Sequence, residues 1–157
     1  MPSSDIISSS EKLAKQKLTI AFAESATAGR LAAEFSLTPF AGEVLCGGIV
    51  CYNVCIKKDV LGVSDELINK YTPESAEVTE ALAVQLSQIM PADIHIAVTG
   101  LTKPGGSETP EKPVGSMFIH IRHKARDYRD YNVFDGSPES IVLQTANRVA
   151  QLLLDII

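Results

Sequence analysis

One apolar run constrains the fold of this chain more than any other segment. Residues 94–99 read Ile-His-Ile-Ala-Val-Thr and lie between Pro91-Ala92-Asp93 and Gly100. A strand that is apolar on both faces is typical of a mostly parallel sheet covered by helices on each side. We therefore expect a buried strand here, with helices packed above and below it.

The remaining strands and helices are predicted from periodicity and from Gly and Pro positions. Further strands are expected at residues 18–23, 44–52, 114–122 and 127–134, the last two forming a hairpin. Helices are expected at residues 8–17, 27–36, 53–61, 64–71 and 73–90, and from Ser137-Pro138 onward, with Pro73 in the first turn of its helix. This order predicts an α/β fold: one three-layer α/β/α domain over residues 1–157, with a mixed, mostly parallel five-stranded sheet.

Composition narrows the possible partners and the compartment. The net charge is −5, which disfavours a nucleic-acid surface because such surfaces need a basic patch. No apolar run approaches the ~20 residues that span a bilayer, and the first residues do not resemble a signal peptide. We therefore expect a cytoplasmic protein that binds neither nucleic acid nor membrane.

The cysteines and histidines do not have the spacing of a metal site. Cys46 and Cys51 lie in an apolar run and are expected to be small buried hydrophobes. His120 and His123 point to opposite faces of a strand, because they are an odd number of positions apart. No metal and no cofactor are therefore predicted.

Three loops are expected to converge into one ligand site. Residues 24–29, 52–58 and 99–113 each follow a predicted parallel strand, and ligands bind beyond the carboxyl ends of such strands. The pair Gly47-Gly48 inside the second strand indicates a bulge or a close backbone approach. Gly105-Gly106-Ser107 could cradle a phosphate with backbone N–H groups, or could be a mobile surface loop.

Ser25 is the candidate nucleophile. It lies with Thr27 before a predicted helix, where a hydroxyl either caps the helix or sits beside donors for an oxyanion. A serine needs a base, and the histidines are not placed at the right strand ends. A lysine shielded from water can act as that base, which makes Lys57 a candidate, with Tyr52 near the same mouth. The alternative for Lys57 and Lys58 is a solvated helix face.

Four successive motifs resemble those of the CinA C-terminal domain family. They match in order and spacing over residues 13–157: Ala23-Glu24-Ser25-Ala26-Thr27-Ala28-Gly29; Gly47-Gly48-Ile49-Val50-Cys51-Tyr52 with Lys57; Ala97-Val98-Thr99-Gly100-Leu101-Thr102-Lys103-Pro104-Gly105-Gly106; and Lys112-Pro113-Val114-Gly115. Better-known members of that family are nicotinamide-nucleotide amidohydrolases, which convert nicotinamide mononucleotide to nicotinate mononucleotide and ammonia.

The resemblance implies a role for each matching residue. Ser25 would be the nucleophile, Lys57 its base and Tyr52 a helper, without a metal. Thr27, Gly29, Gly47, Gly48, Thr99, Gly100, Lys103, Gly105 and Gly106 would contact the substrate, a small-molecule nucleotide. The resemblance also implies a homo-oligomer.

The chain departs from the family pattern at several positions. Ala28 stands where the family has glycine, a change that would restrict a close backbone approach to substrate. The family arginine before the last helix is replaced by Ser137-Pro138, and Lys103 could supply a point charge in its place. These departures motivate an alternative reading, in which the chain is a catalytically inactive nucleotide-binding or regulatory paralogue.

Overall fold

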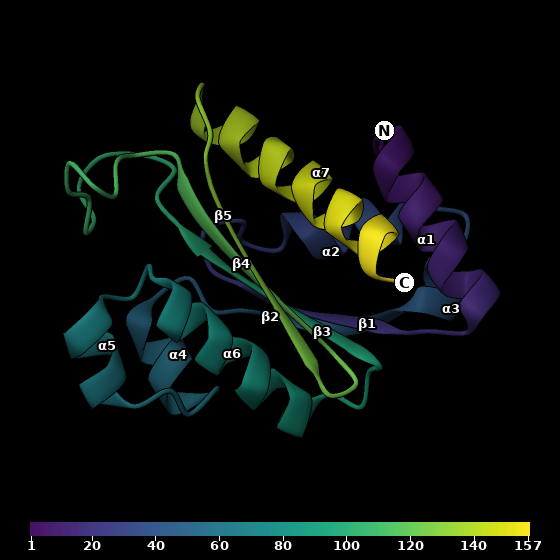
Figure 1. Ribbon diagram of the computed structural model, residues 1–157, viewed down its shortest axis with the longest axis horizontal. Helices are drawn as coiled ribbons and strands as arrows, with labels where there is room; N and C mark the ends of the chain where they lie inside the picture. Colours follow the sequence, from purple (N-terminus) through teal and green to yellow (C-terminus); the bar gives the residue numbers. More distant parts are fainter.

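The computed structural model describes all 157 residues, arranged as helices on both faces of one sheet (Figure 1). The strands are β1 (Ile20–Glu24), β2 (Leu45–Val50), β3 (Ile94–Gly100), β4 (Ser116–His123) and β5 (Arg126–Val133), in the spatial order β2-β1-β3-β4-β5. β1 is parallel to β2 and β3, whereas β4 is antiparallel to β3 and β5. Only β4 is therefore reversed, which confirms the mixed, mostly parallel sheet.

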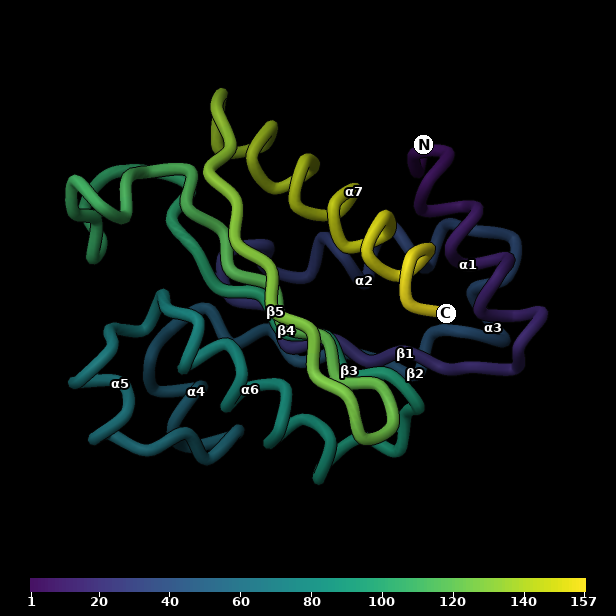
Figure 2. The backbone as a smooth tube through the Cα atoms, viewed as in Figure 1, coloured from purple at the N-terminus to yellow at the C-terminus, as the bar shows by residue number.

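Seven helices form the two outer layers. One face carries α1 (Ser4–Gln16), α2 (Arg30–Ser36), α3 (Ala41–Val44) and α7 (Pro138–Ile156), and the other carries α4 (Val54–Asp59), α5 (Asp65–Tyr71) and α6 (Ala76–Ile89). The tube in Figure 2 shows the long loop between β3 and β4 projecting at one end of the sheet, away from α1 and the C-terminus. No helix combines the length and the apolar character needed to cross a membrane.

The central strands bury both faces, as the apolar run predicts. Ile94, Ile96 and Val98 belong to the core on the α1–α7 side, whereas Ala97 packs on the α6 side. The larger side chains face one helical layer and the small alanines face the other, where α6 lies against β1 and β3. The sheet thus separates two hydrophobic cores, one on each of its faces.

Several predicted helices differ from the structure. α1 begins at Ser4, four residues before its predicted start, because Ser3 is its N-cap and its side chain accepts the Ile6 N–H. α6 begins at Ala76, not Pro73, because the Ser75 hydroxyl caps it by accepting a hydrogen bond from the Val78 N–H at 3.2 Å. α2 begins at Arg30, because Ala28 and Gly29 have positive φ angles of 48° and 93° that a helix does not allow. A short helix, α3, lies within the segment between the second predicted helix and β2.

The glycine pair in β2 causes both effects that the sequence suggests. The register against β1 shifts between Leu45 and Gly47, so that Cys46 is the extra residue of a bulge. A Cβ on Gly48 would lie 3.1 Å from the carbonyl oxygen of Phe22, a closer approach than side chains normally make. Cys46 is exposed at the bulge, so its predicted burial is wrong, whereas Cys51 is buried as expected.

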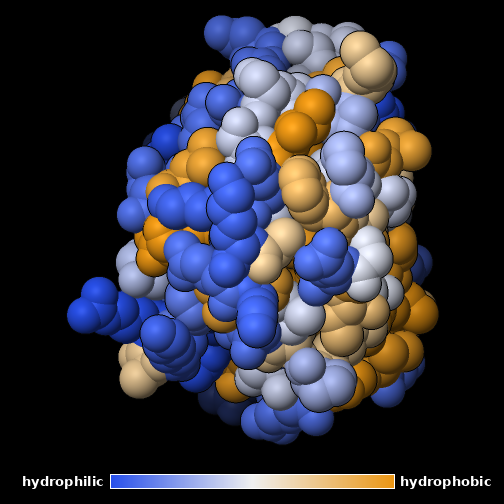
Figure 3. Space-filling view, turned by 90° about the vertical axis from the view of Figure 1, so that its right-hand side faces the viewer, coloured by the Kyte–Doolittle hydropathy of each residue, from blue (hydrophilic) through white to orange (hydrophobic).

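The two ends of the sheet differ in character. The space-filling view in Figure 3 faces the end with α1 and α3, where polar residues are interspersed with apolar ones. Three loops and a polar-lined pocket occupy the opposite end, where the parallel strands finish. The chemistry of the chain is therefore concentrated at the carboxyl ends of β1, β2 and β3.

Candidate active site

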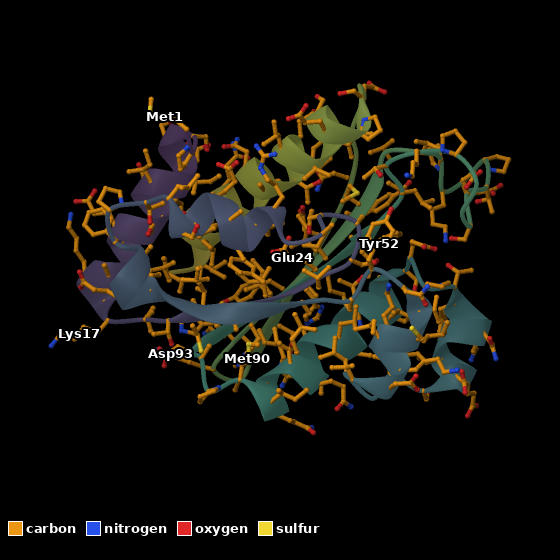
Figure 4. All side chains as sticks on the ribbon, turned by 180° about the vertical axis from the view of Figure 1, so that it is seen from behind. Met1, Lys17, Glu24, Tyr52, Met90 and Asp93 are labelled. Atoms are coloured by element: carbon orange, nitrogen blue, oxygen red, sulfur yellow. The ribbon has the colours of Figure 1, made fainter.

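A pocket of about 170 Å³ lies where the three predicted loops meet. Its walls are formed by Ser25, Ala26, Tyr52, Glu74 and residues 100–106. In Figure 4, Tyr52 lies toward the end of the molecule that carries the long loop, while Lys17 and Asp93 lie at the other end. The predicted convergence of residues 24–29, 52–58 and 99–113 is confirmed.

Ser25 follows β1 directly and is held by the sheet. Its N–H donates to the Val98 carbonyl at 3.0 Å, which continues the pairing of β1 with β3 by one residue. Its side chain faces the pocket and the residue is only 5% exposed. Ser25 does not cap α2, since Gly29 occupies the N-cap position and no side-chain cap bond is made there.

Glu24 caps the start of α2 in place of a hydroxyl. One carboxylate oxygen accepts the N–H groups of Gly29 at 3.1 Å and Leu31 at 3.0 Å, and the other accepts that of Ala32 at 2.9 Å. Glu24 is 1% exposed, and a carboxylate at a helix N-terminus is favoured by the unpaired N–H groups and the helix dipole. The turn of residues 25–29 is therefore held at one end by the hydrogen bond of Ser25 to β3 and at the other end by Glu24 at the start of α2.

Lys57 is brought to Ser25 from the neighbouring crossover. Asn53 caps α4 by accepting the Cys55 N–H at 2.9 Å, and Lys57 lies one turn further along that helix. Its Nζ lies 2.8 Å from Ser25 Oγ and donates to the carbonyl oxygens of Cys51 at 2.7 Å and Tyr52 at 3.3 Å.

Burial changes the acid–base properties of Lys57. The residue is 1% exposed, and this burial lowers the pKa of its ammonium group, because the charged form loses hydration. No carboxylate pairs with Lys57 within 4 Å, whereas Lys58 pairs with Asp65 near the surface. The solvated-face alternative therefore holds for Lys58 and is wrong for Lys57.

The nearby thiol is not a competing nucleophile. Burial raises the pKa of Cys51 to about 11, so the thiol stays protonated near neutrality. Tyr52 is 55% exposed and lines the pocket, and its hydroxyl makes no hydrogen bond within the protein. Its carbonyl supports Lys57, so both its backbone and its side chain contribute to the site.

Unpaired donors lie directly after Ser25. The backbone N–H groups of Ala26 and Thr27 donate no hydrogen bond within the protein, and the buried Thr27 hydroxyl has no partner. The Gly29 N–H donates to Glu24, so it is not a free donor for an oxyanion. Ala28 is exposed and does not line the pocket, so it does not obstruct the site.

The loop that contains Gly105 and Gly106 binds the carboxylate of its own residue Glu108. The N–H groups of Gly105 and Gly106 each donate at 2.9 Å to one carboxylate oxygen of Glu108, and these N–H groups lower the pKa of Glu108. These two N–H groups therefore bind a carboxylate of the same loop. Lys103 lines the pocket, is exposed and pairs with no carboxylate.

Five of the predicted contact residues do not line the pocket: Thr27, Gly29, Gly47, Gly48 and Thr99. Thr99 is buried and its hydroxyl lies 2.8 Å from that of Thr79 in α6, so it packs behind the site. Gly47 and Gly48 lie in the edge strand β2, where they shape the bulge. Thr27 is buried, at 2% exposure, and its N–H group is a candidate donor because it makes no hydrogen bond within the protein. Gly100 does line the pocket, and a Cβ there would lie 2.3 Å from the Met117 sulfur.

Sequence reasoning missed a polar cluster beside the pocket. Lys112 Nζ donates to the Thr72 hydroxyl at 2.6 Å, the Ser107 hydroxyl at 2.8 Å and the Glu74 carbonyl at 2.8 Å. Partial burial lowers the pKa of Lys112. Ser107 in turn donates to the Glu74 carboxylate at 2.5 Å. This cluster ties the long loop to the start of α6, and its only sequence signal is the Lys112-Pro113-Val114-Gly115 motif.

Comparison with known proteins identifies relatives along the whole domain. The model of one protein family, described as the CinA C-terminal domain, matches residues 6–157. A CinA-like protein from Prochlorococcus marinus is 47% identical over 109 residues, which are 69% of this chain and 26% of that protein. A CinA-like protein from Thermotoga maritima is 37% identical over 134 residues, which are 85% of this chain and 32% of that protein. The chain therefore spans about a quarter to a third of these relatives.

Solved structures share the fold almost completely. A CinA superfamily protein from Escherichia coli superimposes with a TM-score of 0.91 at 25% identity, covering 98% of this chain and 88% of that one. A competence/damage inducible protein from Agrobacterium tumefaciens gives a TM-score of 0.89 at 24% identity, with coverage of 99% and 97%.

Proposed function

This chain belongs to the CinA C-terminal domain family, and we propose that it is an amidohydrolase that converts nicotinamide mononucleotide to nicotinate mononucleotide and ammonia. The choice of substrate rests on the resemblance of the motifs to those of nicotinamide-nucleotide amidohydrolases. The observation that carries the chemistry is the distance of 2.8 Å between the buried Lys57 Nζ and the Oγ of Ser25, which lines the pocket.

The neutral form of Lys57 fits its surroundings as a base. A neutral amine has two N–H donors, which match the carbonyl oxygens of Cys51 and Tyr52, and one lone pair, which faces the Ser25 hydroxyl. Burial favours this form, because it lowers the pKa of Lys57. The lysine is thus oriented by two backbone groups to accept the serine proton.

Acylation follows from this arrangement. Ser25 Oγ attacks the carboxamide carbon while Lys57 takes its proton, and the oxyanion is stabilised by the N–H groups of Ala26 and Thr27. When the tetrahedral intermediate collapses, the C–N bond breaks. Lys57 returns the proton to the departing nitrogen, which leaves as ammonia, and an ester remains on Ser25.

Deacylation repeats the same steps with water. Lys57 takes a proton from water, whose oxygen attacks the ester carbon. The C–O bond to Ser25 breaks, Lys57 reprotonates Ser25, and the nucleotide leaves as a carboxylic acid that ionises in solution. Each cycle consumes one water and releases one ammonia.

The size of the pocket suits the reacting part of the nucleotide. A cavity of about 150 Å³ accommodates one benzene ring, so a pocket of about 170 Å³ suits a pyridine carboxamide. The ribose and phosphate would extend along the exposed loop past Lys103, whose unpaired charge can attract the phosphate.

Ammonia release from nicotinamide mononucleotide tests the proposal. The purified protein should release one ammonia for each nicotinate mononucleotide formed, and Ser25→Ala should lower the rate at least ~1,000-fold, as nucleophile removal does in other serine hydrolases. Undiminished release by Ser25→Ala would refute the serine mechanism. If the wild-type protein is stabilised by the nucleotide but forms no product, the chain is the inactive binding paralogue.

A further inference from the structure

Glu74 is the only carboxylate among the residues that line the pocket. It lies between α5 and α6, opposite in charge to Lys103, which is the only lysine in the same lining. Neither the motifs nor the proposed chemistry at Ser25 uses it. A charged group at the wall of a small pocket nevertheless influences which ligands can enter.

The backbone of Glu74 is held in place from two sides. Its carbonyl accepts the Lys112 ammonium at 2.8 Å and the Thr72 hydroxyl at 3.1 Å, while Thr72 itself is fixed at a φ of 70°. The following residue, Ser75, begins the cap of α6. These contacts hold the backbone from which the Glu74 side chain extends into the pocket wall.

The Glu74 carboxylate is oriented and forms no ion pair, although its charge interacts with that of the nearby Lys112. One oxygen, Oε2, accepts the Ser107 hydroxyl at 2.5 Å, and the other oxygen accepts no hydrogen bond within the protein. None of the ion pairs of the protein includes Glu74, because Lys112 binds its carbonyl rather than its carboxylate. The field of this charge reaches the proposed base, where it opposes the lowering of the Lys57 pKa by burial.

We propose that Glu74 determines specificity for a carboxamide carried on a positively charged ring. This inference rests on the proposed function and names the form of the substrate: the ring of nicotinamide mononucleotide is a pyridinium cation, whereas the ring of its reduced form is a neutral dihydropyridine of nearly the same shape. A fixed and unpaired carboxylate attracts the first and gains little from the second. The free oxygen can also accept an N–H of the carboxamide.

Binding measurements in a Ser25→Ala background test the inference without catalysis. The dissociation constants of the oxidised and reduced mononucleotides are measured by calorimetry, with and without Glu74→Gln. The parent should prefer the oxidised form, and Glu74→Gln should reduce that preference roughly tenfold, as expected when one partly desolvated charge pair is lost. Glutamine keeps the backbone carbonyl for Lys112 and a side-chain oxygen for Ser107, so the cluster can persist.

Glu77→Gln is the matched control. It removes the same charge from the first turn of α6, at a residue that does not line the pocket, and should leave the preference unchanged. An equal preference in the parent and in Glu74→Gln would overturn the inference, as would an equal effect of Glu77→Gln. Absence of ammonia release by the wild-type protein would instead refute the proposed hydrolysis, so the two failures are distinguishable.

A second variant separates charge from orientation. Ser107→Ala leaves the Glu74 charge in place but removes the donor that fixes Oε2. It should weaken the preference by a smaller factor than Glu74→Gln. A larger loss in Ser107→Ala than in Glu74→Gln would show that the loop, and not the carboxylate, selects the ligand.

Discussion

Replacing Glu24 by glutamine should destabilise the turn that carries the nucleophile. The wild-type carboxylate accepts three backbone N–H groups at 2.9–3.1 Å with its two oxygens. Glutamine has one oxygen, which can keep the N–H groups of Gly29 and Leu31. Its amide nitrogen would then face the N–H of Ala32, donor against donor, in a site with 1% exposure.

The expected cost is about 2–4 kcal/mol. A hydrogen bond to a buried charged group contributes about 1.5–3 kcal/mol, and a charge at a partly buried helix terminus contributes up to ~2 kcal/mol. The easier burial of a neutral amide offsets part of this loss. For a chain of this size, each kcal/mol corresponds to a shift of about 2–4 °C in Tm, so a decrease of roughly 5–15 °C is expected.

Glu34→Gln provides the control for this measurement. Glu34 belongs to the same helix and pairs with Arg30 at 2.7 Å, but Arg30 is 40% exposed and can return to water. Such a pair contributes about 0.5 kcal/mol, so Glu34→Gln should lower the Tm by only ~2 °C. Thermal and urea denaturation followed by circular dichroism give both values. If Glu24→Gln costs no more than Glu34→Gln, capping by Glu24 does not hold the Ser25 turn.

The other predictions concern activity. The kcat/KM for ammonia release should rise with pH to a plateau, because only neutral Lys57 can accept the Ser25 proton. The midpoint of this rise should lie below the pKa of an exposed lysine, because burial lowers the pKa of Lys57. In Glu74→Gln this midpoint should move further down, since an opposing negative charge is gone, and a midpoint that moves up would contradict the electrostatic reasoning. Lys103→Ala should raise KM about tenfold for the mononucleotide and leave KM for nicotinamide riboside nearly unchanged, because only the former has a phosphate; an equal change for both would exclude a phosphate contact.

The layers and the sheet could be predicted because they depend on local patterns. The apolar run at residues 94–99, the Ser137-Pro138 helix start and the short hairpin link each act over a few residues. The convergence of the three loops followed from the parallel strands alone. The pairing of Ser25 with Lys57 also agrees with the prediction, because both lie one loop beyond adjacent parallel strands.

The residues whose roles were predicted wrongly or not at all depend on contacts between segments far apart in the sequence. Thr99 was expected at the ligand, but its side chain shares the α6 side of the sheet with Ala97, two positions before it. Glu24 precedes Ser and Thr residues, which are the more common helix caps, so its role as the cap of α2 was not predicted. Glu74 and Lys112 come from segments that meet only when the long loop folds against α6.

The bulge in β2 and the charges of β5 also protect the open borders of the sheet. These two strands have unpaired backbone groups along one side, where another extended chain could attach and begin aggregation. The extra residue Cys46 interrupts the regular spacing on one border. On the other border, a foreign strand would meet the charged residues Arg126, Asp127, Arg129 and Asp130. Both features therefore disfavour pairing between the edge strands of two copies of this protein.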